Sequence, residues 1–325
     1  MPEALRNFER AELLGHDPDE CAAQRWYCWM LLGDLERAWQ EGDAIAARGA
    51  PDPNRLWDGL PLDNKRVIIR CLHGYGDAIQ FLRYAALVRG RASRVIVETH
   101  LEMVPLLSGL AGVDEVITWG DGSSAGFSAW DSQIEVMELP RIFRTTLETI
   151  PWRRPYLSVT AATKQESARN LPSHGLPRVG VLWTSSNWNE ERSIPFPEFS
   201  RILQVPGFSF FSFQRGPARR DLRSLVDTAC HDTAEHSPGI HDTAADLANM
   251  DLLITVDTMA AHLAGALGTP VWTLLPYRAD WRWMLQREDT PWYPTMRLLR
   301  QTEPGNWSPV IDRVVRDLIG LPRTS

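Results

Sequence analysis

Apolar residues recur with two different spacings along this chain, and the change of spacing divides it into parts. Residues 19–32 and 35–48 carry apolar side chains at helical spacing, and Gly33-Asp34 between them has the composition of a turn. Residues 1–50 are therefore predicted to form a short antiparallel helical hairpin. From about residue 55 onward, short β-branched runs alternate with helical stretches, which is the pattern of a parallel sheet whose strands are joined by helices.

The β-branched runs form two series of predicted strands. The first series occupies 67–69, 95–97, 116–117 and 134–136, with helices predicted at 80–89 and 102–110. The second series occupies 179–183, 208–213, 252–256, 271–275 and 296–299. The polar segment 161–177 is predicted to be a linker, and a last helix at 308–318 is expected to cross back to the first half.

The two series predict an α/β fold, in which two Rossmann-like domains have a cleft between them. A length of 325 residues is sufficient for two ordinary domains. The expected boundaries are 1–50 for the hairpin, 51–165 for the first Rossmann-like domain and 166–325 for the second. Because a single helical hairpin cannot bury a continuous core by itself, we expect it to dock on the domain that follows.

Composition excludes several classes of protein. With 34 basic and 41 acidic side chains the formal net charge is −7, and no Lys/Arg cluster is present, so nucleic acid is a poor partner. No apolar stretch approaches the roughly 18 residues that a transmembrane segment needs, and the first residues lack the apolar region of a signal peptide. A cytoplasmic protein is therefore expected. The four cysteines show no C-x-x-C spacing, so neither a disulfide framework nor a metal site is predicted.

Fourteen tryptophans is an unusually large number. Most of these rings are expected to fill hydrophobic cores, because aromatic side chains bury large areas. The alternative is an aromatic platform for a carbohydrate or a nucleobase, for which Trp281, Trp283 and Trp292 are the candidates.

The first group of candidate functional residues follows the first predicted strand, in the run His73-Gly74-Tyr75-Gly76-Asp77. Ligands of open α/β sheets bind outside the carboxyl ends of the strands, where this loop is expected to lie. Gly74 and Gly76 permit close approach of a ligand to the backbone. Asp77 precedes a helix predicted to begin at Ala78, so the alternative to a functional role is a helix N-cap.

A second group stands between the predicted strand 252–256 and a small-residue helix predicted at 259–267. Asp257 and Thr258 occupy the turn, and His262 lies one turn into the helix. The N-terminus of a helix presents free N–H groups that suit a phosphate or diphosphate. The alternative for His262 is an ordinary structural histidine.

A third group follows the strand 179–183, where Thr184-Ser185-Ser186 precede Arg192. Hydroxyl groups in such a loop, followed by a guanidinium that can bind two phosphate oxygens, predict a phosphate clamp. The alternative is a polar surface loop with an exposed arginine.

These segments resemble bacterial glycosyltransferases of the GT-B fold. The similarity rests on LWDGLPLDNKRVIIRCLHGYGDAIQFLRY, LWTSSNWNEERSIP, Phe-Gln-Arg-Gly at 213–216, and ITVDTMAAHLAGALGTPVWTLLP followed by DWRWMLQREDTPWYP. More narrowly, residues 55–320 resemble the heptosyltransferase-like domain of glycosyltransferase family 9, which is often fused to tetratricopeptide repeats. Residues 33–38 resemble the turn and second helix of one such repeat.

The resemblance implies roles in binding and catalysis. Asp77 matches the acidic residue of the family that is taken as the general base. Thr184, Ser185 and Arg192 match a phosphate-binding pair and a basic residue, although heptosyltransferases proper carry lysine at the position of Arg192.

Further residues are assigned to the donor by the same resemblance. Asp257, Thr258 and His262 match a D-T-x-x-x-H motif that holds the phosphates and the sugar of the donor. Gln214 and Arg215 match residues that line the nucleoside pocket. Heptosyltransferases proper lack both the repeat hairpin and the DWRW block, so the resemblance leaves the sugar and the acceptor open.

The sequence therefore predicts an inverting, metal-independent glycosyltransferase for hexosyl or heptosyl transfer. Its donor would be a nucleotide-diphosphate sugar, used as co-substrate without a further cofactor, and its acceptor a glycan or protein hydroxyl. One alternative is a non-catalytic sugar-nucleotide or glycan-binding protein that keeps the fold. Another is an interaction module in which the repeat hairpin dominates.

Overall fold

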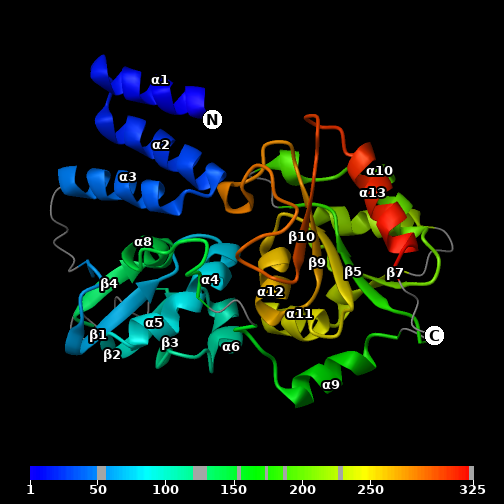
Figure 1. Cartoon of the computed structure of the whole chain (residues 1–325). Helices are drawn as coiled ribbons and strands as arrows, with labels where there is room; N and C mark the ends of the chain where they lie inside the picture. Colours follow the sequence, from blue (N-terminus) through cyan, green and yellow to red (C-terminus); the bar gives the residue numbers. More distant parts are fainter. Residues whose placement is uncertain are drawn as a thin grey trace. The chain divides into compact units, whose positions relative to one another are not determined.

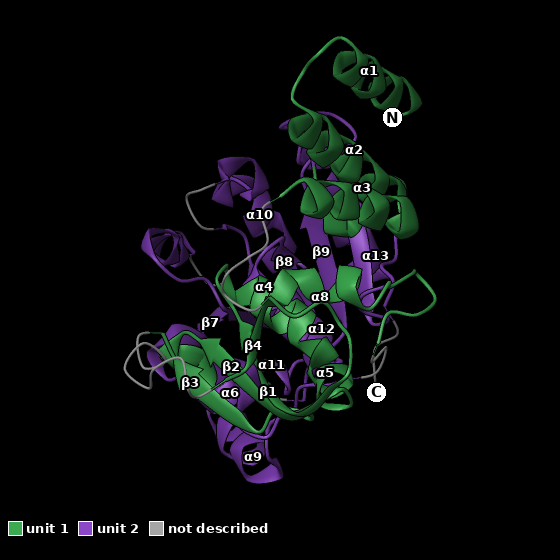
Figure 2. Cartoon of the chain, turned by 90° about the vertical axis from the view of Figure 1, so that its left-hand side faces the viewer, with its two compact units in different colours: residues 1–104, 111–153, 279–287 green, residues 105–110, 154–278, 288–325 purple. Residues whose placement is uncertain are grey.

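The computed structural model describes residues 1–49, 56–119, 130–151, 155–172, 175–185, 189–225 and 230–321. The chain divides into two compact units, coloured green and purple in Figure 2. Unit 1 comprises residues 1–104, 111–153 and 279–287, and unit 2 comprises residues 105–110, 154–278 and 288–325. Unit 1 thus contains a short piece from late in the sequence, residues 279–287, which we call the return segment.

Unit 1 begins with three helices, blue in Figure 1: α1 (Pro2–Leu13), α2 (Pro18–Leu32) and α3 (Leu35–Arg48). α2 packs against both α1 and α3. The Asp17 carboxylate caps α2 by accepting the N–H groups of Asp19 and Glu20, and Gly33 ends it in the left-handed conformation at φ 79°. The two predicted helices of the hairpin are confirmed, and α1 precedes them.

The sheet of unit 1 is parallel, with the strand order β3-β2-β1-β4. Its strands are β1 (Leu62–Arg70), β2 (Ala92–Thr99), β3 (Glu115–Thr118) and β4 (Ser132–Glu135). The helices that follow β1 are α4 (Tyr75–Phe81), η1 (Leu82–Tyr84) and α5 (Ala85–Arg89); η2 (Leu101–Met103) and α6 (Val104–Leu107) follow β2; η3 (Val136–Glu138) and α8 (Leu139–Ile142) follow β4. All four predicted strands are confirmed, and the β-branched runs of β1 and β2, Val67-Ile68-Ile69 and Val95-Ile96-Val97, form the buried centre of the sheet.

Unit 2 contains a six-stranded parallel sheet with the order β10-β9-β8-β5-β6-β7. Its strands are β5 (Arg178–Leu182), β6 (Ser209–Ser212), β7 (Cys230–Asp232), β8 (Leu252–Val256), β9 (Val271–Leu275) and β10 (Met296–Arg300). Numbered along the chain, these strands follow the order 3-2-1-4-5-6 of the dinucleotide-binding Rossmann fold. The prediction missed β7, because a three-residue edge strand of Cys, His and Asp has no apolar run.

The helices of unit 2 correct two expectations. They are α9 (Ala161–Arg169), α10 (Phe196–Leu203), α11 (Ile240–Leu247), α12 (Met259–Leu267) and α13 (Ser308–Ile319), with η4 (Glu190–Arg192), η5 (Pro217–Ser224) and η6 (Thr233–Glu235). The segment predicted as a linker contains α9, which is capped by Thr160 and packs on α11. The last helix, α13, does not cross to the first half: its apolar face is buried in unit 2, where it packs on α10.

The expectation that the tryptophans fill hydrophobic cores is confirmed for Trp281, Trp283 and Trp292, and the alternative of an aromatic platform is wrong. Trp281 is 8% exposed, and Trp283 and Trp292 are each 1% exposed, so these rings are core residues with no open face. The four cysteines are free thiols, and three of them are buried. No helix among the described residues is both long and apolar enough to span a membrane.

Candidate functional site

Both sheets reverse their strand order at one position, and most of the candidate residues follow the strands at these positions, whereas Gln214 and Arg215 follow β6. In unit 1 the reversal lies between β1 and β4, and in unit 2 between β5 and β8. Open α/β sheets bind ligands outside the carboxyl ends of the strands at such switch points. We call the residues there the unit-1 site and the unit-2 site.

Asp77 of the unit-1 site lies in the first turn of α4 and is not its N-cap. The helix begins at Tyr75, three residues earlier than predicted, with Gly74 as N-cap. The Oδ2 atom of Asp77 accepts the Gly74 N–H at 3.0 Å, so the carboxylate satisfies one of the free donors at this helix end. Gly74 has φ −69°, which any residue can adopt, and Gly76 lies within the helix.

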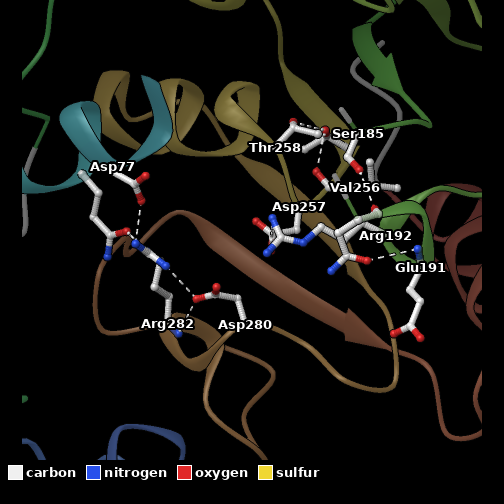
Figure 3. A network of polar contacts seen from close by, with 12 residues as sticks. Asp77, Ser185, Glu191, Arg192, Val256, Asp257, Thr258, Asp280 and Arg282 are labelled. Carbon is white, nitrogen blue, oxygen red and sulfur yellow. Dashed lines mark hydrogen bonds and ion pairs between the residues drawn. The ribbon is translucent and has the colours of Figure 1, made fainter. Parts of the chain in front are cut away.

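Arg282 of the return segment is a partner of Asp77 that sequence reasoning did not find. Its Nη2 atom donates to Asp77 Oδ1 at 2.5 Å (Figure 3). The Arg282 side chain is 9% exposed and that of Asp77 is 24% exposed. The tryptophans on either side of Arg282 were the one signal for this contact in the sequence, because they indicate a buried segment.

Glu135, the last residue of β4, is a second residue that the prediction missed. It pairs in register with Arg70, the last residue of β1, and therefore ends at the switch point of unit 1. Its Oε2 atom accepts the Met137 N–H at 2.7 Å, and its Oε1 atom lies 3.9 Å from His73 Nε2. Burial, together with the nearby negative charges of Glu138 and Asp77, raises the pKa of Glu135 to about 7.

The unit-2 site begins with the loop after β5. Gln214 is 4% exposed, and its Oε1 atom accepts the N–H groups of Trp183 and Thr184 at 3.2 and 2.9 Å. Its Nε2 atom donates to Thr184 Oγ1 at 2.6 Å. The Ser185 N–H donates to the Ser193 hydroxyl at 3.1 Å. Gln214 thus holds the loop in place, whereas Ser186 lies outside the described residues.

Arg192 is not an exposed surface arginine. Its Nη1 atom lies 3.4 Å from Asp257 Oδ2, and the two side chains are 13% and 4% exposed (Figure 3). Arg192 ends η4 after β5, and Asp257 follows β8, the neighbouring strand in the sheet. The switch point therefore brings together two residues that are far apart in sequence.

Thr258 is the N-cap of α12, and its hydroxyl lies 3.2 Å from that of Thr255. The positive end of the helix dipole therefore lies directly beside Asp257. His262 is 6% exposed, and its Nδ1 atom lies 3.0 Å from the Tyr293 hydroxyl. Tyr293 is itself 1% exposed, so this pair is part of the packed interior of unit 2.

Arg215, predicted for the nucleoside pocket, contacts Ser237 and Thr243, the latter in α11. Its Nη2 atom donates to the Ser237 carbonyl and to Thr243 Oγ1. Burial lowers the pKa of Arg215 below its ordinary value. Among the residues that the structure describes, no group of three or more His, Cys, Asp and Glu side chains is arranged to hold a metal ion.

Comparison with known proteins identifies one long relative by sequence. Protein FlbA of Caulobacter vibrioides is 25% identical over 347 residues, which cover 97% of this chain and 58% of FlbA. The chain therefore spans little more than half the length of this curated relative. No protein-family profile matches the sequence.

Solved structures show the fold. The glycosyl transferase family 9 protein from Veillonella parvula DSM 2008 matches with TM-score 0.57 and 13% identity over 75% of this chain and 88% of its own. The E. coli ADP-heptose lps heptosyltransferase II matches with TM-score 0.57 and 15% identity, covering 78% and 98%. E. coli heptosyltransferase WaaC with ADP-2-deoxy-2-fluoro heptose matches with TM-score 0.52 and 14% identity, covering 78% of this chain and 99% of its own. The expected resemblance to family 9, with two Rossmann-like domains, is confirmed at the level of the fold.

Proposed function

We propose that this chain is a glycosyltransferase that moves a sugar from a nucleotide-diphosphate sugar to an acceptor hydroxyl. The observation that carries the proposal is the position of Arg192 beside Asp257 and the N-terminus of α12, at the switch point of a Rossmann-ordered sheet. A guanidinium and a helix N-terminus are both suited to diphosphate oxygens. Asp257, which is buried, lies 3.4 Å from the guanidinium and would orient it toward the donor.

The donor we propose to test first is ADP-heptose. Two of the solved structures of the same fold are named for heptosyl transfer with ADP-linked donors. Isothermal titration calorimetry with ADP-heptose, and with UDP-, GDP- and CMP-sugars as comparisons, measures the preference. Binding to a non-adenine donor alone would contradict the choice of ADP, and binding to none of them would contradict the proposed function.

Asp77 is the proposed general base. An acceptor hydroxyl would transfer its proton to the Asp77 carboxylate while its oxygen forms a bond to the anomeric carbon of the donor. The bond from that carbon to the diphosphate breaks in the same step, so the configuration inverts and the nucleoside diphosphate departs with the bonding electrons. Asp77 keeps a quarter of its side-chain surface exposed for this contact.

The test is Asp77→Asn, with nucleotide release and donor affinity measured on one preparation. The asparagine oxygen still accepts the Gly74 N–H, so the N-cap of α4 should be retained, whereas the amide nitrogen in place of Oδ1 cannot accept from Arg282. Turnover should fall by about 10²–10⁴-fold, the range for loss of a general base, while donor affinity stays near that of the wild type. Equal turnover in both proteins would overturn the assignment. Donor binding without any turnover in the wild type would identify a non-catalytic binding protein instead.

We further propose that the negative charge on the departing diphosphate is stabilised by Arg192 and the N-terminus of α12 without a metal ion. Turnover should then be the same in EDTA as in Mg²⁺. Loss of turnover in EDTA that is restored by added Mg²⁺ would contradict this part of the mechanism.

A further inference from the structure

The return segment carries Arg282 into unit 1 and buries it. Within this segment, the whole residues Trp281 and Arg282 are each 8% exposed, and Trp283 is 1% exposed. Asp280 accepts the Arg282 backbone N–H at 3.0 Å and so initiates η7 (Trp281–Trp283). The N–H donors of a buried arginine side chain need hydrogen-bond acceptors, and the identity of these acceptors indicates the role of the arginine.

The partners of the Arg282 guanidinium come from helix α4, which carries Asp77, and from the return segment itself. Besides the bond from Nη2 to Asp77 Oδ1, Nε donates to Gln80 Oε1 at 2.9 Å and Nη1 donates to Asp280 Oδ1 at 2.8 Å (Figure 3). The guanidinium also lies over the ring of Trp281, 4.4 Å from its centroid. This arrangement uses the planar fork of arginine, and a lysine ammonium cannot reproduce it.

Helix α2 also contacts the return segment. The rings of Trp26 and Trp281 meet edge to face with centroids 5.4 Å apart. The Leu285 N–H donates to the Leu31 carbonyl at 3.2 Å. Met284 has φ 53°, an unfavourable conformation for a residue with a side chain, and it persists where the surrounding packing imposes it.

We propose that Arg282 is a positioning residue for Asp77, and that helix α2 holds Arg282 in place through Trp26 and Trp281. The hairpin and the first turn of α4, which carries Asp77, are then one functional unit. This inference rests on the proposed function for its catalytic meaning, but the contact itself is testable without substrate. A buried ion pair is a weak source of stability, because well-packed apolar residues often do as well, so orientation of the carboxylate is the better account of this one.

The first experiment compares Arg282→Lys with the wild-type full chain by hydrogen exchange. The variant keeps the charge and loses the fork, so exchange in the peptide spanning residues 71–82 should rise about tenfold while the rest of unit 1 is unchanged. The control is Arg278→Lys, an exposed arginine four positions earlier, which should change nothing. Unchanged exchange in 71–82, or an equal rise throughout unit 1, would overturn the positioning role.

The second experiment tests the contribution of α2. Trp26→Ala does not touch Asp77, yet it should raise exchange in the same 71–82 peptide, whereas Tyr27→Ala, at the exposed neighbouring position, should not. Equal exchange in Trp26→Ala and wild type would remove the hairpin from the proposal. Trp26→Ala also serves as the independent test of the contact if Arg282→Lys does not fold.

Turnover with ADP-heptose provides the catalytic measurement. Arg282→Lys should lower kcat by about 10–100-fold, the scale of a misplaced catalytic group, and leave the donor KM within about twofold, because the proposed donor site is in unit 2. A change in KM alone would contradict the inference. Local loosening of 71–82 in Arg282→Lys, combined with unaltered turnover in Asp77→Asn, would retain the contact and reject the proposed catalytic function.

Discussion

Arg192 and Asp257 form an ion pair inside unit 2, with Nη1 and Oδ2 3.4 Å apart. Asp257 is buried and lies directly before the N-cap of α12, so its charge is balanced by this guanidinium and by the helix N-terminus. The same guanidinium is the proposed ligand of the donor diphosphate. Under the proposed function Arg192 is expected to contribute both to the stability of the fold and to donor binding, and the two contributions can be measured separately.

Arg192→Ala should weaken ADP binding by about 1.5–3 kcal/mol, the size of a hydrogen bond to a charged group. It should also lower the free energy of unfolding by about 1–3 kcal/mol, because the Asp257 carboxylate loses its cation while it remains buried. Calorimetry with ADP and urea denaturation measure the two effects. In the double variant Arg192→Ala/Asp257→Asn, stability should recover while ADP affinity stays low. Recovery of both the stability and the ADP affinity in the double variant would show that Arg192 affects ADP binding only by stabilising the fold.

Glu135 makes stability depend on pH. Its pKa is about 7 in the folded protein and near the ordinary 4.5 when unfolded, so between these values the folded protein binds the additional proton. The free energy of unfolding therefore falls as the pH rises from about 4.5 to 7. Above pH 7 the Glu135 carboxyl is ionised in the folded protein and the full cost of burying its charge is reached. Glu135→Gln should be more stable than wild type by about 1–2 kcal/mol at pH 8, after allowance for partial exposure, and by less at pH 5.

Urea denaturation at the two pH values measures this difference. Glu36→Gln, an exposed position on α3, is the matched control and should show no pH-dependent difference. A gain for Glu135→Gln that is the same at pH 5 and pH 8 would mean that packing, and not titration of this carboxyl, is responsible.

Gly265 allows Tyr293 to pack against α12. A Cβ atom at this position would lie 2.5 Å from Tyr293 Cδ1, so the ring must shift and the contact between Tyr293 and His262 must change. Gly265→Ala should therefore reduce the free energy of unfolding by about 1–3 kcal/mol, the usual cost of overpacking. Gly49→Ala, where the added methyl group meets only ordinary contacts, is the control in the same denaturation experiment. Equal stability of the two variants would show that the ring relaxes freely.

Removal of residues 1–49 should expose apolar surface of unit 1. Trp39 is 4% exposed and donates its Nε1–H to the Thr145 carbonyl at 2.7 Å, and Trp26 covers Trp281. Asp43 also pairs with Arg141 and Arg144. The shortened chain should aggregate in light scattering and unfold at a lower temperature. A monodisperse protein of unchanged stability would identify the hairpin as an independent appendage.

Local patterns of the sequence were sufficient for most of the elements. The apolar run at 252–256 and the small residues at 259–267 predicted β8 and α12 with the bounds that the structure shows. They succeeded because burial on both sides makes a parallel strand apolar throughout, whatever its partners are. The same reasoning missed β7 and misjudged α9, whose composition is polar and whose position depends on contacts made elsewhere.

The sequence by itself determined that polar residues follow β1, β5 and β8, because a strand and the loop after it are neighbours in the chain. The partners of those residues were decided only by the tertiary structure. Asp77 and Arg282 are separated by 205 positions, and His262 and Tyr293 by 31. Periodicity reports that a face is buried, but the partner of that face depends on strand order and on the path of the return segment, which no local pattern encodes.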